Sequence, residues 1–307
     1  MNRAALCFPG QGSQVAGMAT GLLDGPLASS LLDVAGAEGV DLAAALRGSD
    51  AELRPTEIAQ PALLFVELVL AGALPGDLDV VGVAGHSVGE YAAASVAGAF
   101  SPEDAMRLVI ARGREMSGMS EGTMAAVIGL DSDTVASVCD QVRSAGEVVV
   151  IGNFNAPSQV VISGTVAGVE QAGAVARQRG ARRVVQLNVS GAFHSPLMGP
   201  AAGRFAQKID ATPRHQLRTP VVCNVDGAAV SDSSDLPSRL ARQLEAPVRW
   251  VDCVNALVSL GADVLVEVGP GSVLSGLARR IVPDVRTAVV NHCDSASALT
   301  ALWTAPA

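Results

Sequence analysis

Short apolar runs alternate with helical stretches along the chain, a pattern typical of an α/β protein. The runs that predict buried strands are 4–8, 80–84, 221–225 and 264–268. The stretches that predict helices are 61–73, 90–97 and 102–116. The last of these has the clearest start, because Ser101 is a favoured N-cap and Pro102 suits the first helical position.

Residues 123–189 form a separate unit in this pattern. Their order is strand, helix, strand, strand, helix, strand, which is the ferredoxin-like arrangement. The stretches are 124–130, 132–144, 148–153, 159–163, 166–179 and 183–189. Glycine and serine are frequent at both ends of the unit. We therefore predict a small ferredoxin-like domain, 123–189, inserted into a larger α/β domain formed by 1–122 and 190–307.

Composition and charge narrow the function classes. The 307 residues are 49% hydrophobic and 17% charged, which argues against disorder. The net charge of −9 argues against a nucleic-acid partner, because proteins that bind nucleic acids carry basic surfaces. No apolar run approaches the ~20 residues that span a bilayer, and the apolar part of the N-terminus is too short for a signal peptide. We expect a soluble cytoplasmic protein with no membrane partner.

The cysteines indicate neither a disulfide framework nor a metal site. Their number is odd and no Cys-x-x-Cys pair occurs. We therefore expect no metal, and we expect all five to be small core residues. They are Cys7, Cys139, Cys223, Cys253 and Cys293.

The segment 85–89, Gly-His-Ser-Val-Gly, lies between a predicted strand and a predicted helix. In that context Gly-x-Ser-x-Gly predicts a nucleophile elbow, with Ser87 exposed at the helix N-terminus. The backbone N–H of Val88, one residue later, is the expected donor to an oxyanion. The alternative is an ordinary glycine-rich turn.

A serine nucleophile needs a base, and the chain has four histidines. His86 adjoins Ser87, His215 lies in a polar stretch and His292 is near the C-terminus. His194 follows the predicted insert, where the large domain resumes, and loops at such junctions line clefts. His194 is therefore the best candidate for the base.

Arg112 lies on the apolar side of the helix that begins after Ser101. It is four residues after Leu108, whereas Arg107 and Arg114 fall on the opposite side. A guanidinium on an apolar face needs an anion, because it does not deprotonate in proteins. Its spacing leaves two alternatives open: a buried structural ion pair, or a clamp for a substrate carboxylate.

Several motifs occur in an order that resembles one enzyme family. They are 8–14 (Phe-Pro-Gly-Gln-Gly-Ser-Gln), 60–64 (Gln-Pro-Ala-Leu-Leu), 85–90 (Gly-His-Ser-Val-Gly-Glu), 112–113 (Arg-Gly), 153–155 (Asn-Phe-Asn), 193–195 (Phe-His-Ser) and 267–271 (Glu-Val-Gly-Pro-Gly). Together they resemble the malonyl-CoA:acyl carrier protein transacylases, which include the acyltransferase domains of polyketide synthases. The resemblance extends from Phe8 to about Arg280.

This resemblance implies an α/β-hydrolase-like large domain and a ping-pong reaction. A malonyl group would pass from coenzyme A to Ser87 and then to the phosphopantetheine thiol of an acyl carrier protein, without a cofactor. His194 matches the family's base, which a backbone carbonyl at the position of Gln243 orients. Gln11 matches the residue whose N–H completes the oxyanion hole with Val88.

The remaining matches concern the substrate. Arg112 matches the carboxylate-binding arginine, which favours the clamp over the ion pair. Gln60 and Asn155 match polar residues that line the site. Phe193 before His194 resembles the malonyl-selective pattern of polyketide acyltransferases, where a phenyl ring leaves little room for an α-methyl group. Gly191 departs from that pattern, which usually has histidine there.

Three other functions compete with malonyl transfer. They are a serine hydrolase or thioesterase on the same elbow, an acyltransferase for a different acyl unit, and a non-catalytic carrier-protein docking module. A simple hydrolase has no need of a buried carboxylate clamp, so Arg112 favours transfer. Because the chain is acidic, an acidic carrier protein needs a local basic surface. The candidates are Arg182–Arg183 and Arg279–Arg280.

Overall fold

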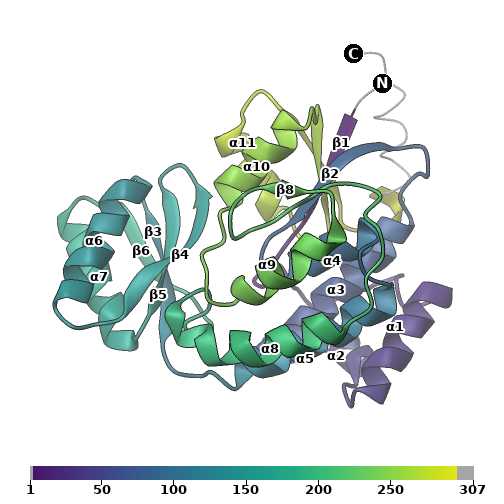
Figure 1. Ribbon diagram of the computed structural model, residues 1–307, viewed down its shortest axis with the longest axis horizontal. Coiled ribbons are helices and arrows are strands. Elements are labelled where there is room, and N and C mark those ends of the chain that lie inside the picture. Colours follow the sequence, from purple (N-terminus) through teal and green to yellow (C-terminus); the bar gives the residue numbers. More distant parts are fainter. Residues whose placement is uncertain (1–2, 296–307) are drawn as a thin grey trace.

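The computed structural model describes residues 3–295, which form two lobes (Figure 1). The larger lobe holds a six-stranded sheet in the order β10-β9-β1-β2-β7-β8. All neighbours in it pair in parallel except β7 and β8. Its strands are β1 (Arg3–Phe8), β2 (Asp79–Gly85), β7 (Val221–Val222), β8 (Ala229–Val230), β9 (Val264–Val268) and β10 (Arg286–Val290).

Helices cover both faces of this sheet, as a mostly parallel sheet requires. The helices of this lobe are α1 (Pro26–Ala37), α2 (Leu42–Arg47), α3 (Thr56–Gly72), α4 (Gly89–Val96), α5 (Pro102–Ser117), α8 (Gly199–Ala211), α9 (Leu236–Arg242), α10 (Trp250–Ser259) and α11 (Val273–Ile281), with short 3₁₀ turns η1 (Pro196–Met198) and η2 (Ser233–Asp235). Strand β1 shows the two-sided burial: Leu6 and Phe8 pack into one core, and Ala5 and Cys7 into another.

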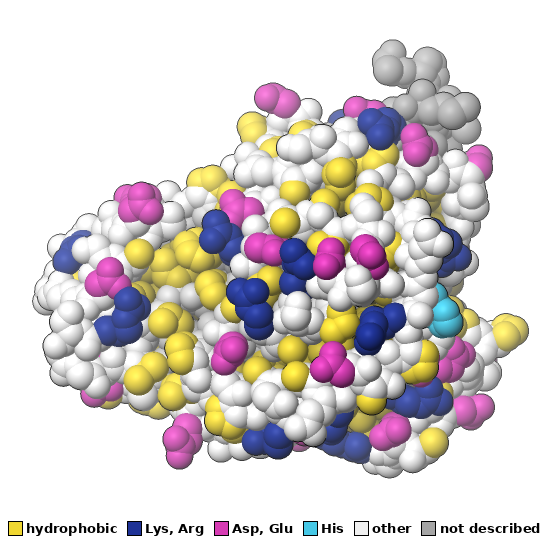
Figure 2. Space-filling model, in the orientation of Figure 1, with side chains coloured by type: hydrophobic (Ala, Val, Ile, Leu, Met, Phe, Trp, Pro, Cys, Tyr) yellow, Lys and Arg dark blue, Asp and Glu magenta, His cyan; other side chains and the backbone are white. Residues whose placement is uncertain are grey.

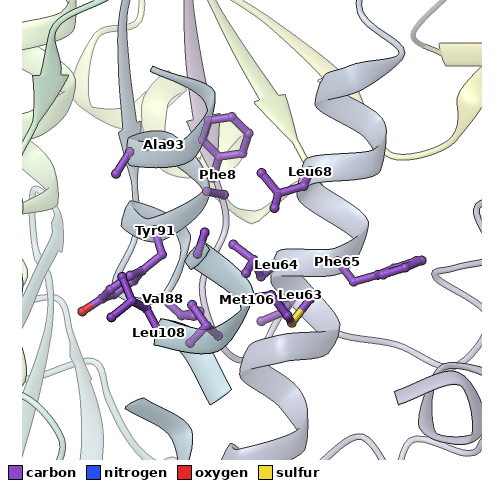
Figure 3. Packing of buried hydrophobic residues seen from close by; sticks show 14 of the residues in the cluster. Phe8, Leu63, Leu64, Phe65, Leu68, Val88, Tyr91, Ala93, Met106 and Leu108 are labelled. Carbon is purple, nitrogen blue, oxygen red and sulfur yellow. The ribbon is translucent and has the colours of Figure 1, made fainter. Parts of the chain in front are cut away.

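The larger core fixes the helix that follows the elbow. Phe8, Leu64 and Leu68 lie together between α3 and α4, with Val88 and Tyr91 close by (Figure 3). Each of these side chains is at most 4% exposed. The start of α4 is therefore held by apolar packing against β1, α3 and α5.

The smaller lobe is an antiparallel sheet in the order β4-β5-β3-β6, with two helices on one face. Its elements are β3 (Thr123–Ile128), α6 (Ser132–Ser144), β4 (Val149–Ala156), β5 (Gln159–Gly164), α7 (Val166–Gln178) and β6 (Arg183–Gln186). This order and pairing are ferredoxin-like. The predicted fold class, an α/β-hydrolase-like lobe with a ferredoxin-like insert, is confirmed.

The open face of the small sheet turns toward the larger lobe. Met124 and Val161 on that face belong to the core of the large lobe. The hydroxyl of Ser163 donates to the carbonyl of Phe193 at 2.6 Å, and the N–H of Phe154 donates to the carbonyl of Val248 at 2.9 Å. These bonds hold the two lobes against each other beside His194.

Several predicted element bounds differ from the structure, among them the strand predicted at 183–189, which ends at Gln186. Three wrong predictions have a clear physical reason. Helix α3 begins at Thr56 rather than Pro61, because residues before the proline are buried against α5 and this packing outweighs the lost hydrogen bond. Strand β7 ends at Val222 rather than continuing to 225, because the chain turns back toward β8, with the N–H of Gly227 donating to the carbonyl of Cys223. Cys293 is exposed after β10, whereas the other four cysteines are buried.

Candidate active site

Ser87 occupies a sharp turn between β2 and α4, and its φ of +52° is in the left-handed region. The turn requires glycine on both sides. A Cβ at Gly85 would lie 1.9 Å from the backbone of Gly89, and one at Gly89 would lie 2.2 Å from the carbonyl oxygen of Phe8. Because the strand, the helix and β1 approach this closely, the motif forms the predicted elbow.

His194 lies beside Ser87 in the structure. The serine Oγ is 2.8 Å from Nε2 of His194, and Nδ1 is 2.8 Å from the carbonyl oxygen of Gln243. A carbonyl only accepts, so Nδ1 carries the proton and Nε2 is left to accept one. Burial, and then the charge of Arg112, lower the pKa of His194 to about 3. The imidazole is therefore neutral near pH 7 and able to act as a base.

Two backbone N–H groups are available near Ser87 for a developing oxyanion. Val88 occupies the N-cap position of α4, and Gln11 lines the same cavity as Ser87. A Cβ at Gly10 would lie 2.6 Å from the carbonyl oxygen of His86, so the loop of Gln11 lies directly against the elbow. Within residues 3–295 neither N–H has a hydrogen-bond acceptor. Both can therefore donate to a ligand.

Arg112 is 1% exposed and reaches the serine from α5. Its guanidinium donates to Oε1 of Gln60 at 2.6 Å, to Oε1 of Gln243 at 2.9 Å and to Oγ of Ser87 at 3.0 Å. It also lies 5.5 Å from the ring centroid of Tyr91. Among the described residues no carboxylate is within ion-pair distance of it. The described residues therefore contain no structural ion pair of Arg112. Neutral side-chain oxygens hold its guanidinium next to Ser87.

A cavity of about 140 Å³ joins these groups. It is small beside the ~300–1,000 Å³ of drug-sized ligand pockets, so it suits a short acyl group. The large lobe supplies the polar groups already described. The insert supplies walls from β3, β4 and β5, which include Met124, Asn153, Asn155 and Val161; Phe193 follows the insert and also lines the space.

Gln60 and Asn155 occupy different places. Asn155 lines the cavity, and its Oδ1 lies 2.9 Å from Nε2 of His86. Gln60 is fully buried behind Arg112, where its amide donates to Oγ1 of Thr56 at 2.8 Å. The amide of Gln60 therefore orients the guanidinium, and it does not line the cavity itself.

Sequence reasoning missed two buried polar residues under the elbow. Asn224 donates to the carbonyl of Gly85 at 2.7 Å and accepts from the N–H of Ser87 at 2.8 Å. Glu90 accepts from the backbone N–H of Asn224 at 3.1 Å and from the amide of Gln243 at 2.5 Å. Burial raises the pKa of Glu90 to about 7 against these bonds. The available signals were the carboxylate of Glu90 in an alanine-rich helix and the position of Asn224 just after a buried strand. Each indicates a polar side chain in a buried place.

Residues 3–295 contain no group of three histidine, cysteine or acidic side chains that could hold a metal ion. No helix in the same part of the chain is both long and apolar enough to cross a bilayer.

The doubly covered parallel sheet, the serine elbow and its neutral histidine define the class as a serine acyl-transferring enzyme. Comparison with known proteins gives the family. The family model described as "Acyl transferase domain" matches residues 6–295, and the chain belongs to this family.

Similar proteins extend over nearly the whole chain. The malonyl CoA-acyl carrier protein transacylase of Bacillus subtilis is 39% identical over 95% of this chain and 94% of its own length. The protein of that name from Escherichia coli K12 is also 39% identical, over 95% and 97%. A solved transacylase from Coxiella burnetii superposes with a TM-score of 0.91 at 34% identity, covering 98% and 97%. A malonyl-transacylase solved with a type II polyketide carrier protein superposes with a TM-score of 0.91 at 36% sequence identity. The match covers 99% of this chain and 100% of that one.

Proposed function

We propose that this enzyme transfers a malonyl group from coenzyme A to the phosphopantetheine thiol of an acyl carrier protein through an ester on Ser87. One observation carries the proposal: the Ser87 hydroxyl lies 2.8 Å from a neutral imidazole and 3.0 Å from a buried guanidinium. The names of the relatives support the same substrates.

In the first half-reaction the Ser87 oxygen attacks the thioester carbonyl while Nε2 of His194 accepts its proton. The carbonyl of Gln243 orients the resulting imidazolium. The N–H groups of Val88 and Gln11 stabilise the tetrahedral oxyanion, and loss of one such donor typically lowers the rate ~10²–10³-fold. The C–S bond then breaks, and His194 returns the proton to the coenzyme A sulfur.

The second half-reaction runs the same steps in reverse on a new thiol. His194 accepts the proton of the phosphopantetheine thiol, and the sulfur attacks the Ser87 ester. The C–O bond breaks, and the proton returns to the serine oxygen. Because thioester and oxygen ester are close in energy, the exchange needs no cofactor, only transition-state stabilisation and exclusion of water.

Arg112 selects the acyl group by its far carboxylate. A malonyl carboxylate can form the bidentate pair that the surrounding amides of Gln60 and Gln243 do not provide. An acetyl group would leave the buried guanidinium without an anion, at a cost of about 3–5 kcal/mol by analogy with a broken buried pair. This discrimination argues for transfer of a diacid unit over simple ester hydrolysis.

The basic surface for the carrier protein is at Arg182–Arg183 in our proposal. Arg280 donates a hydrogen bond to the carbonyl of Pro157, and Arg279 donates one to Thr287. By contrast, no hydrogen bond or ion pair joins the side chains of Arg182 and Arg183 to another described residue. These two exposed arginines border the edge strand β6. Elsewhere basic and acidic side chains are interspersed, as the face in Figure 2 illustrates. At Arg182–Arg183 the local positive charge therefore offsets the net charge of −9 that would otherwise repel an acidic partner.

The domain boundaries and the compartment are also part of the proposal. The insert comprises 123–189 between parts 1–122 and 190–307, because one apolar cluster is built from residues 125–184 alone. The free cysteines favour a reducing, cytoplasmic location.

A panel of acyl-CoA donors tests the function. Intact-mass and peptide spectrometry should find malonyl on Ser87, and added holo carrier protein should remove it faster than water does. The S87A variant should remain unlabelled. Rapid hydrolysis with no transfer to the carrier thiol would instead assign a thioesterase, and an equally fast acetyl adduct would exclude diacid selection.

A further inference from the structure

The side chain of Asn224 continues the pairing of β2 with β7 beyond the end of β7. Residues 83–84 lie opposite 221–222, so the same register places Asn224 opposite His86. In a parallel ladder, a residue at that place donates its N–H to the carbonyl one residue before its partner. It also accepts from the N–H one residue after its partner.

Asn224 makes both of these bonds with its side chain instead of its main chain. Nδ2 donates to the carbonyl of Gly85 at 2.7 Å, and Oδ1 accepts from the N–H of Ser87 at 2.8 Å. Its own N–H is thereby free to donate to Glu90 at 3.1 Å. The amide thus acts as one extra peptide unit at the point where the elbow leaves the sheet.

The orientation of this amide is determined by its neighbours. The carbonyl of Gly85 only accepts and the N–H of Ser87 only donates, so the reversed amide would make neither bond. Gln243 Nε2 adds a donor 3.3 Å from Oδ1. Asn224 is 0% exposed, so water cannot replace these bonds.

We infer that Asn224 is a positioning residue, which holds Ser87 in its left-handed conformation and so aims both its hydroxyl and the following Val88 N–H. The inference rests on the proposed acyl transfer through Ser87. It concerns the geometry of the nucleophile and assigns Asn224 no contact with the acyl donor.

The test compares N224A with V254A. Val254 is buried in α10 within the core shared with Val222, and its truncation removes no polar contact at the elbow. The rate of Ser87 sulfonylation by phenylmethanesulfonyl fluoride reports the nucleophile without any acyl donor, so it stays informative if malonyl transfer itself is disproved. Malonyl loading of Ser87 and melting temperature are measured alongside.

We expect N224A to slow both reactions about 10²-fold, the usual effect of losing one transition-state donor. The sulfonylation and loading rates of V254A should stay within threefold of the wild-type rates, although its melting temperature should fall as much as that of N224A. Malonyl-CoA affinity, measured by calorimetry in S87A and S87A/N224A, should agree within threefold. Equal rates for N224A and V254A, or an affinity loss as large as the rate loss, would overturn the inference.

N224D provides a second measurement. It keeps an acceptor for the Ser87 N–H in a side chain of the same shape, so its sulfonylation rate should lie between those of wild type and N224A. Should N224A not fold, N224D is compared with V254A directly. Slower labelling of N224D than of V254A supports the inference, and equal labelling contradicts it.

Discussion

His194 Nδ1 lies 2.8 Å from the backbone carbonyl oxygen of Gln243, so a main-chain dipole orients the base where many serine enzymes use a carboxylate. The dipole carries no full charge to stabilise an imidazolium. Burial, and then the charge of Arg112, lower the pKa of His194 to about 3, although the hydrogen bond to Gln243 raises it.

The pH profile of Ser87 loading should reflect that depressed pKa. A base works in its neutral form, which for His194 persists at every pH well above 3. We therefore expect kcat/KM for loading to show no acid limb near pH 6.5. The profile is measured in E90Q, because Glu90 has a pKa of about 7 and would titrate in the same window. A limb between pH 6 and 7 in that variant would refute the assignment.

Replacing Arg112 should change which donor the enzyme accepts. We expect R112A to lower kcat/KM for malonyl-CoA about 10²–10³-fold, equivalent to about 3–4 kcal/mol of a broken buried pair. The rate with acetyl-CoA should fall much less, because acetyl makes no contact with the guanidinium. R107A is the control, since Arg107 is exposed on the same helix and pairs with Asp104. An unchanged malonyl-to-acetyl ratio would contradict the clamp.

Truncating Phe193 should admit a branched donor. In F193A the ratio of kcat/KM for methylmalonyl-CoA to that for malonyl-CoA should rise at least about tenfold, the usual effect of one methyl group in a shaped pocket. F205A removes another buried ring, which lies outside the cavity, and should leave the ratio unchanged. If both variants shift the ratio alike, the change reflects lost stability and not pocket shape.

Reversing the charge of the edge-strand arginines should affect only the second half-reaction. R182E/R183E is expected to raise the KM for the carrier protein and to leave loading from malonyl-CoA unchanged, since the site lies elsewhere. The rise should shrink at high salt because exposed charges are screened. R279E/R280E should have the smaller effect, and the reverse ranking would move the docking surface to α11.

Local signals predicted much of this molecule. The cap at Ser101, the Gly-x-Ser-x-Gly turn and the helical spacing of Arg112 each act over a few residues, and the structure contains all three features. The roles of Phe193 and Asn155 in substrate binding remain predictions from resemblance, and both residues line the cavity. The prediction that Gln60 lines the site was wrong, because its amide lies behind Arg112.

Long-range contacts explain what was not predicted. The bonds of Asn224 join residues more than 130 positions apart, and no periodicity in a single sequence reports such a pair. The start of α3 at Thr56 depends on packing against α5, which outweighs the local signal of Pro61.

The division of the cavity between the two lobes has a consequence for how such enzymes diversify. Ser87, His194 and Arg112 all belong to the large lobe, whereas Met124 and Val161 line the cavity from the inserted sheet. Exchange of that sheet between relatives can therefore retune acyl preference while the bond-making apparatus stays intact.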